Sequence, residues 1–130
     1  MNCAQRKAVQ SSIEKSGQFV KYFYAQKTHK NGRTDVVTYC FIISGNCETI
    51  RVGKTRKSRK DNHKKEIGRA ISLYRATVCK EIPVSSIQSL GMDARAELAL
   101  VETINHIRLT AQTISFNSNR SSVGTLINNA

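Results

Sequence analysis

The chain has 130 residues, a formal net charge of +12, no tryptophan and 39% hydrophobic residues. This length suits one domain with its own core, and the hydrophobic content is that of a globular rather than a disordered protein. No apolar run approaches the roughly 18 residues of a membrane-spanning helix, and the N-terminus lacks the apolar core of an export signal. We therefore expect a cytoplasmic protein with no membrane partner.

The positive charge is concentrated in the first 80 residues. They hold 18 Lys and Arg against five Asp and Glu, whereas residues 81–130 hold three Lys and Arg against four Asp and Glu. Concentrating like charges costs self-repulsion, which a polyanionic partner would relieve. The distribution therefore indicates a surface that binds a polyanion, and the alternative is a solvated basic face without a partner.

Cysteine and histidine do not form a recognisable site. The four cysteines include no Cys-x-x-Cys pair, and the three histidines are scattered. Zinc sites usually show close ligand pairs, so we expect no metal and four free thiols. The acids of the basic half form no close pair, and no histidine neighbours Cys40, Cys47 or Cys79 in sequence. We predict neither an enzyme nor a bound cofactor.

Taken in chain order, residues 2–15 predict a short helix with an apolar stripe of Val9 and Ile13. Strands over 18–26, 36–43 and 48–54 follow, and they predict a three-stranded antiparallel meander. Asn31-Gly32 is a strong hairpin signal because both central residues of such a turn need positive φ. A second tight turn is expected at residues 44–47.

Two-residue turns at these places would fix the register of the sheet. Tyr22 would then face Phe41, and Phe41 would face Ile50. Alternation would give a predicted core face of Val20, Tyr22, Tyr24, Val37, Tyr39, Phe41, Ile43, Ile50 and Val52. The other face would mix cations with aromatics and other residues: Phe19, Lys21, Phe23, Thr38, Cys40, Ile42, Thr49 and Arg51.

Phe19 and Phe23 flank Lys21 on this mixed face. Aromatic side chains on a basic sheet can stack on unpaired bases. The alternative is that a helix covers the face and that both phenylalanines belong to the core.

A dense basic run follows the third strand, since residues 54–65 contain seven cations and one acid. Lys and Arg neutralise phosphates, and a helix N-terminus directly after the run would add free N–H groups. We therefore predict phosphate contacts, with a solvated loop as the alternative. The predicted nucleic-acid-binding residues are Lys21, Arg51, Lys54, Arg56, Lys57, Arg59, Lys60, Lys64, Lys65 and Arg69.

An amphipathic helix is predicted after the basic run, with Asp61 or Asn62 as N-cap and an end near Cys79. Its expected core face recurs at helical spacing and consists of Ile67, Ile71, Tyr74 and Val78. Glycine is unfavourable inside a helix, so Gly68 indicates that the helix closely approaches a strand. The alternative is a close approach to the backbone of a ligand.

Residues 92–112 predict a C-terminal helix with a broad apolar sector, which could be buried on two sides or could form a homodimer. Residues 113–130 are rich in Asn and Ser and predict a mobile tail. The expected organisation is therefore a single basic α+β domain over 1–112, followed by this tail. Its sheet is the meander, with the amphipathic helix on the apolar face.

Part of the chain resembles a pattern in small bacteriophage proteins of unknown function. The residues concerned are Val52-Gly53, Asp61, and the run Gly68-Arg69-x-Ile71-x-x-x-Arg75-Ala76. They cover about 25 residues, and His63 stands where that pattern would place an aromatic residue. The resemblance implies a viral origin and a bacterial host cytoplasm, but no activity.

The predicted order of three antiparallel strands and a helix also resembles the plan of plant ethylene-response-factor DNA-binding domains. Such a domain lays its sheet in the major groove. The characteristic Trp and Arg positions of that family are missing from this chain, which has no tryptophan at all. No residue roles therefore follow from this second resemblance.

These features predict a basic nucleic-acid-binding protein that contacts phosphates with limited sequence specificity. RNA or single strands are favoured over duplex DNA because no familiar recognition helix is present. Two alternatives remain. The chain could be a phage inhibitor that binds an acidic host protein, or an oligomer that sequesters a phosphorylated nucleotide signal.

Overall fold

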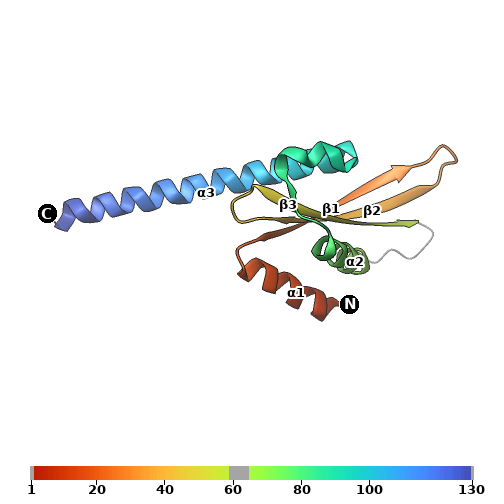
Figure 1. Ribbon diagram of the computed structural model, residues 1–130, viewed down its shortest axis with the longest axis horizontal. Coiled ribbons are helices and arrows are strands. Elements are labelled where there is room, and N and C mark those ends of the chain that lie inside the picture. The colour runs from red at the N-terminus through yellow and green to blue at the C-terminus, as the bar shows by residue number, and fades with distance from the viewer. Residues whose placement is uncertain (1, 59–64, 130) are drawn as a thin grey trace.

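The computed structural model describes the backbone of residues 2–58 and 65–129, and the side chains of residues 2–56 and 65–111. It has the predicted α+β class, with one antiparallel sheet in the order β1-β2-β3-β4 (Figure 1). The meander of three strands is confirmed, and a two-residue fourth strand that was not predicted pairs with β3. In chain order the elements are α1 (Cys3–Lys15), β1 (Phe19–Thr28), β2 (Thr34–Ile43), β3 (Thr49–Ser58), α2 (Lys65–Val78), β4 (Ile82–Pro83), the 3-10 helix η1 (Val84–Leu90) and α3 (Ala94–Asn129).

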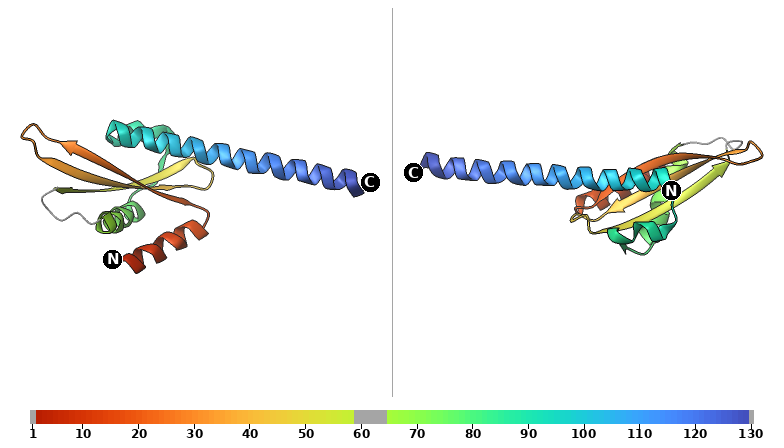
Figure 2. Two further views of the ribbon diagram at one scale, coloured as in Figure 1. Left: turned by 180° about the vertical axis from the view of Figure 1, so that it is seen from behind. Right: turned by 90° about the horizontal axis from the view of Figure 1, so that it is seen from above.

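Helices cover both faces of the sheet. The α1 and α2 helices lie on one face, while η1 and the first half of α3 lie on the other (Figures 1 and 2). The central strand β2 is accordingly buried at every position from Val37 to Ile43. A strand buried on both faces has a continuous apolar sequence rather than an alternating one, and this is the pattern of β2.

The first hairpin turns through three residues rather than the predicted two. The backbone N–H of His29 donates to the carbonyl of Arg33 at 2.7 Å, and Gly32 has a φ of +82°. A left-handed residue at the end of a three-residue turn is a common hairpin geometry. Pairing therefore shifts by one residue, so that Tyr22 lies opposite Cys40 and not opposite Phe41.

A shift of one residue moves every side chain of a strand to the other face of the sheet. The predicted faces of β1 are therefore wrong. Phe19, Lys21 and Phe23 share the face that carries Phe41, beneath η1 and α3. Val20 and Tyr22 lie on the face beneath α1 and α2. Lys21 and Arg51, which were predicted to share a face, are on opposite faces of the sheet.

The second turn is longer than predicted as well. Ser44 N–H donates to the carbonyl of Thr49 at 3.0 Å, and Cys47 has a φ of +60°. Phe41 consequently lies opposite Val52 rather than Ile50. A shift of two residues keeps each side chain on its own face, so the predicted faces of β2 and β3 are correct although their register is not.

The α2 helix ends at Val78, close to the predicted end near Cys79, while its predicted N-cap residues Asp61 and Asn62 lie outside the described residues. It packs on the other face of the sheet from the one that carries Tyr39 and Phe41. The expectation that this helix covers the predicted core face is therefore wrong. The predicted core face of the helix is also wrong, because Ile67, Tyr74 and Val78 are exposed. Its buried residues are Gly68, Ala70, Ser72, Leu73 and Ala76.

The close approach of α2 to β3 explains which residues the helix buries. A Cβ atom added at Gly53 of β3 would overlap the carbonyl oxygen of Ser72 and the amide nitrogen of Ala76. The two backbones therefore touch, and only small residues fit along this line of contact. Leu73 is a large apolar residue that α2 buries, and it packs with Val20, Cys40 and Ile42 of the sheet. Ile67, Tyr74 and Val78 are exposed instead.

The C-terminal helix α3 is longer than predicted. Its first half buries Ala96, Leu100, Ile104 and Ile107 against the sheet. Its 36 residues correspond to a length of about 54 Å, and the second half extends well beyond the sheet (Figure 1). The backbone of the predicted tail is thus helical up to Asn129, and the mobility of residues 113–130 stays a prediction.

The four cysteines are free thiols. Cys3 and Cys79 are exposed, whereas Cys40 lies in the core beneath α1 and α2, and Cys47 lies in the core beneath α3. Burial raises the pKa of the Cys40 thiol to about 12.

None of the helices that the structure describes is long and apolar enough to cross a membrane.

Candidate nucleic-acid interface

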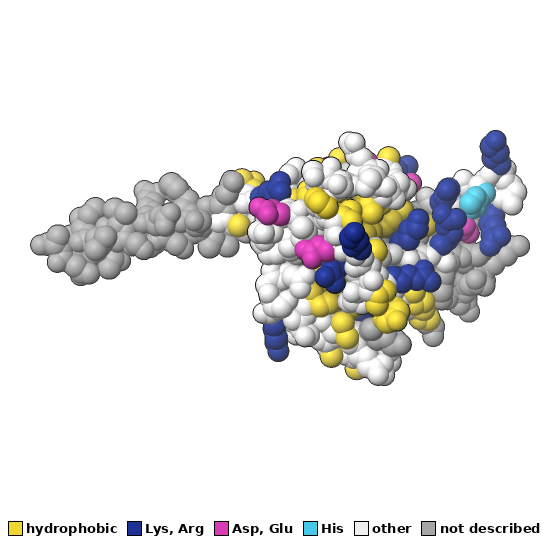
Figure 3. Space-filling model, in the orientation of Figure 1, with side chains coloured by type: hydrophobic (Ala, Val, Ile, Leu, Met, Phe, Trp, Pro, Cys, Tyr) yellow, Lys and Arg dark blue, Asp and Glu magenta, His cyan; other side chains and the backbone are white. Residues whose placement is uncertain are grey.

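Lysine and arginine side chains gather over the half of the molecule that carries the β1–β2 hairpin (Figure 3). A hairpin cation lies near a cation of β3, since the charges of both Arg33 and Arg56 act on Asp35. We define the basic surface by its exposed members on the hairpin, β3, α2 and α3: Lys27, Lys30, Arg33, Lys54, Arg56, Lys65 and Arg95.

A pocket of about 490 Å³ lies within this surface, at the free edge of the sheet. β1 is the outermost strand, so one side of its backbone has no neighbouring strand. Lys65 comes from α2 on one face and Arg95 from α3 on the other, and both line the pocket. We call this pocket the edge pocket. Its other lining residues are Phe23, Tyr24, Ala25, Gln26 and Val36.

Cations surround the aromatic ring of Tyr24 in this region. The Lys65 ammonium lies 5.5 Å from the ring centroid, and the Arg69 guanidinium lies 5.7 Å from it. Arg69 Nε also donates a hydrogen bond to the Tyr24 hydroxyl. Cation–π contacts of this kind hold both charges beside a partly exposed aromatic side chain. Tyr24 thus couples the edge strand to the start of α2.

A buried polar network lies next to this cluster and holds α1 against α2. The Arg6 side chain is only 7% exposed, and it forms an ion pair with Glu66. Arg6 also donates to Gln10 Oε1 at 2.7 Å, and Gln10 accepts a second bond from the Tyr22 hydroxyl at 2.9 Å. Although burial alone would lower the pKa of Arg6, its hydrogen bonds to Glu66 and Tyr22 raise it overall. Burial raises the pKa of Tyr22 to about 12.

Two carboxylates neutralise part of the positive charge. The pKa of Glu66 is lowered mainly by its hydrogen bond to Arg6. The pKa of Asp35 is lowered mainly by its hydrogen bond to His29, whose Nε2 lies 2.8 Å from Asp35 Oδ2, and further by nearby arginines. Both acids therefore stabilise the folded protein in their charged form.

We expect acid to destabilise the protein through these two groups. A carboxyl whose pKa is lowered on folding contributes stability that is complete above its unfolded pKa, which is about 4. That contribution is lost as the pH falls through the folded pKa. Unfolding by urea, measured between pH 7 and pH 2.5, should show constant stability down to about pH 5 and a decline below pH 4.

The variant Glu66→Gln tests this assignment, with Glu14→Gln on the exposed part of α1 as the control. Glu66→Gln should be less stable than the wild type at pH 7 and should lose less further stability on acidification. A Glu66→Gln protein with the wild-type pH profile would show that Glu66 does not titrate as described.

The predicted binding residues fall into separate groups. Lys65 and Arg69 surround Tyr24, and Lys54 and Arg56 belong to the basic surface. Lys21 lies against α3 in a depression that it shares with Glu102 and His106. The described side chains do not include Lys57, and Arg59, Lys60 and Lys64 lie outside the described residues.

Arg51 is already occupied by contacts within the fold. Its guanidinium lies 3.6 Å from the Glu81 carboxylate and donates to the carbonyl of Thr77 at 3.3 Å. These contacts tie β3 to the end of α2. Arg51 lies toward the opposite end of β3 from Arg56, and its predicted role in binding stays a prediction.

The two phenylalanines predicted to stack on bases are half-buried. Phe19 and Phe23 pack against the core cluster beneath α3, as in the alternative interpretation of the sequence. Phe23 additionally lines the edge pocket. Only this second residue lies near the gathered cations.

Sequence reasoning missed Arg95 and the hairpin cations Lys27, Lys30 and Arg33. The hairpin residues flank the Asn31-Gly32 turn, so their clustering could have been found from the predicted hairpin. Arg95 lies in the part of the chain with a net charge of −1 and joins the pocket only through the packing of α3. No sequence signal identifies it.

Within the part of the chain that the structure describes, no group of three or more His, Cys, Asp or Glu side chains is placed to hold a metal ion. Comparisons of the chain with protein-family models, with curated proteins and with solved structures each gave no match. The site is therefore interpreted from its own geometry.

Proposed function

We propose that this chain is a basic nucleic-acid-binding protein of phage origin that contacts the phosphate backbone with limited sequence specificity. The observation that carries the proposal is the edge pocket, where Lys65 and Arg95 approach one groove from opposite faces of the sheet. Each of these two cations can neutralise a phosphate of a nucleic-acid backbone that runs along the groove.

Single-stranded nucleic acid, RNA in particular, fits the edge pocket better than duplex DNA. The aromatic side chains of Phe23 and Tyr24 line the groove beside its cations and give it apolar walls that an unpaired base can contact. The outer edge of β1, which pairs with no described strand, offers backbone groups that any base can use. Neither feature provides a distinct pattern for one base, which agrees with limited sequence specificity. Activity in the host cytoplasm stays a prediction.

Affinity for a 20-nucleotide single-stranded RNA should be micromolar or tighter at about 50 mM salt and should fall steeply as salt is raised. The double variant Lys65→Ala/Arg95→Ala should bind about tenfold more weakly at about 100 mM salt. If two phosphate contacts are lost, the slope of log K against log salt should decrease by about 1.4. Fluorescence anisotropy across a salt series measures both quantities.

The matched control is the double variant Lys7→Ala/Lys15→Ala, which removes the same charge from exposed positions on α1. It should retain most of the wild-type affinity. Equal weakening of both double variants would show that net charge alone attracts the RNA. Absence of wild-type binding at low salt would disprove the proposed function, and tighter binding to a duplex of the same sequence would exclude the preference for single strands.

A further inference from the structure

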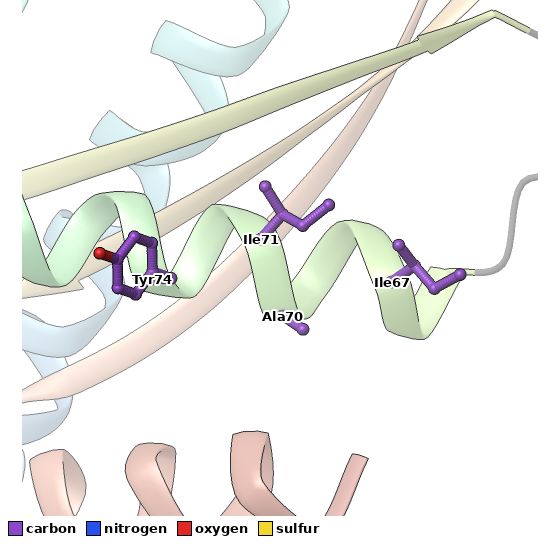
Figure 4. A pocket seen from close by; sticks show the side chains of 4 residues that line it. All are labelled: Ile67, Ala70, Ile71 and Tyr74. Atoms are coloured by element: carbon purple, nitrogen blue, oxygen red, sulfur yellow. The ribbon is translucent and has the colours of Figure 1, made fainter. Parts of the chain in front are cut away.

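The solvent-facing side of α2 carries a row of apolar side chains. We call Ile67, Ile71, Tyr74 and Val78 the α2 stripe. Ile67 is 39% exposed, Tyr74 58% and Val78 67%, while Ile71 is half-buried. Together with Ala70, the first three members of the stripe line a depression of about 500 Å³ on the outside of the helix (Figure 4).

A row of exposed apolar residues is unusual on a helix whose other side packs against a sheet. The outward face of an amphipathic helix normally carries charged and polar residues. Scattered exposed apolar residues are common, whereas a contiguous row that lines a hollow marks an interaction surface. The close contact between α2 and Gly53 places small residues inward and leaves this row outward.

One cation of α2 lies beside the stripe. Arg75 is exposed near the last turn of the helix, whereas the Lys65 side chain contacts Tyr24 in the edge pocket. Arg75 donates to the carbonyl of Lys54 at 2.7 Å, which holds its guanidinium between the helix and β3. Glu66 is the only acid in Lys65–Val78, and it is held by Arg6 and Arg69. The stripe is therefore an apolar row with Arg75 beside it and no free carboxylate on its own helix.

We propose that the α2 stripe is a docking groove for an acidic amphipathic helix of another protein. From Ile67 to Val78 the stripe is about 16 Å long, which matches three turns of a bound helix. A helix in a groove anchors itself through apolar side chains on one face. Acids beside those anchors would lie near Arg75, and the net charge of +12 attracts an acidic partner. The complementary charge also speeds association.

A second copy of this chain fits the stripe poorly. Each copy carries a net charge of +12, which opposes the pairing of two stripes. Ile67, Ile71 and Tyr74 line a hollow, which suits the rounded side of a helix better than a flat lipid surface. The proposal does not depend on nucleic-acid binding, since the stripe lies on the outer side of α2.

The probe for this proposal is a synthetic 18-residue helical peptide with Leu along one face and Glu on the remaining positions. A second peptide carries Lys in place of Glu, and a third has the first composition in scrambled order. The protein variant is Ile67→Ser/Tyr74→Ser, which changes two exposed positions. Leu98→Ser is the matched control, because Leu98 is 59% exposed and lies on α3.

The wild type and Leu98→Ser should bind the acidic peptide with a micromolar Kd in fluorescence anisotropy, and Ile67→Ser/Tyr74→Ser should bind it at least tenfold more weakly. The lysine and scrambled peptides should not bind. Equal binding of the acidic peptide by the wild type and by the double variant would overturn the proposal, as would no binding up to about 1 mM peptide. Thermal unfolding of the double variant should match that of the wild type, so a loss of binding cannot be attributed to misfolding.

Two further measurements separate this proposal from its competitors. Sedimentation with anionic phospholipid vesicles should show no difference between the wild type and Ile67→Ser/Tyr74→Ser; a loss of vesicle binding in the variant, without peptide binding by the wild type, would assign the stripe to a membrane surface. Ile67→Ser/Tyr74→Ser should bind the 20-nucleotide RNA like the wild type. Failure of RNA binding in all proteins would leave the peptide result intact.

Discussion

Replacement of Gly53 by alanine is expected to lower the free energy of unfolding by about 3 kcal/mol or more. The added Cβ would overlap the backbone oxygen of Ser72 and the backbone nitrogen of Ala76, and it would lie 3.0 Å from Ala76 Cα. These are backbone atoms of α2, so no side-chain rotation can relieve the overlap. The helix would have to move away from β3 and would leave Leu73, which is fully buried, less well packed.

Urea unfolding followed by circular dichroism measures this change. Gly32→Ala is the matched control, because its Cβ would meet no atom within 4 Å and would suffer only from the positive φ at that position. We expect the control to cost about 1 kcal/mol. If Gly53→Ala cost no more than Gly32→Ala, the close contact between α2 and β3 would be incorrect.

Replacement of Arg6 by methionine should cost about 3 kcal/mol of stability. Arg6 pairs with Glu66 and donates to Gln10 in a region where its own side chain is almost fully covered. Removing one partner of a buried pair leaves the other charge without compensation, which is the main source of the cost. Glu66 is partly exposed and keeps a contact of 3.8 Å with Arg69, so we expect the lower end of the usual range.

Lys7→Met, at the exposed neighbouring position of α1, serves as the control and should change stability by less than about 0.5 kcal/mol. The double variant Arg6→Met/Glu66→Gln should regain part of the loss because it removes the uncompensated charge. Arg6→Lys should rescue stability incompletely, since an ammonium group cannot reproduce the forked hydrogen bonds of the guanidinium. A double variant less stable than the sum of its single changes would contradict the pairing.

The order and type of the three α-helices and the three long strands could be predicted from the sequence because each has a local signal, whereas β4 and η1 were not predicted. Apolar spacing identifies α2 and α3, and β-branched and aromatic residues identify the three long strands. The register could not be predicted in the same way. It depends on whether Gly32 ends a three-residue turn or lies inside a two-residue turn, and Asn31-Gly32 suits both. The place of Gly32 in the turn therefore decides on which face of the sheet Phe23 lies.

The buried side of α2 illustrates a different limit. Periodicity arguments assume that the largest apolar residues of a helix face the core. Here Gly53 allows the helix backbone to touch β3, so that small residues such as Ser72 and Ala76 are buried. Gly68 of the helix is buried, and the close approach to a strand that it indicates stays a prediction. The contact of Gly53 with α2 could not be predicted, because contact between a strand and a helix is a tertiary property.

The candidate site was predictable only as a property of charge. The concentration of cations in residues 1–80 is visible in the sequence, and Lys65 and Arg69 were correctly expected near the start of a helix. Arg95 joins Lys65 only because α3 crosses the sheet beside β1. The ion pair of Arg51 with Glu81 could not be predicted either, because it depends on the chain returning to β3 after α2.

The two buried thiols allow each half of the core to be monitored separately. Cys40 is enclosed by the layer of α1 and α2, and Cys47 by the layer of α3. A thiol reagent can reach either sulfur only when the corresponding layer detaches, whereas Cys3 and Cys79 react without any opening. The order in which Cys40 and Cys47 become modified in the native protein therefore reveals which helical layer separates first from the sheet.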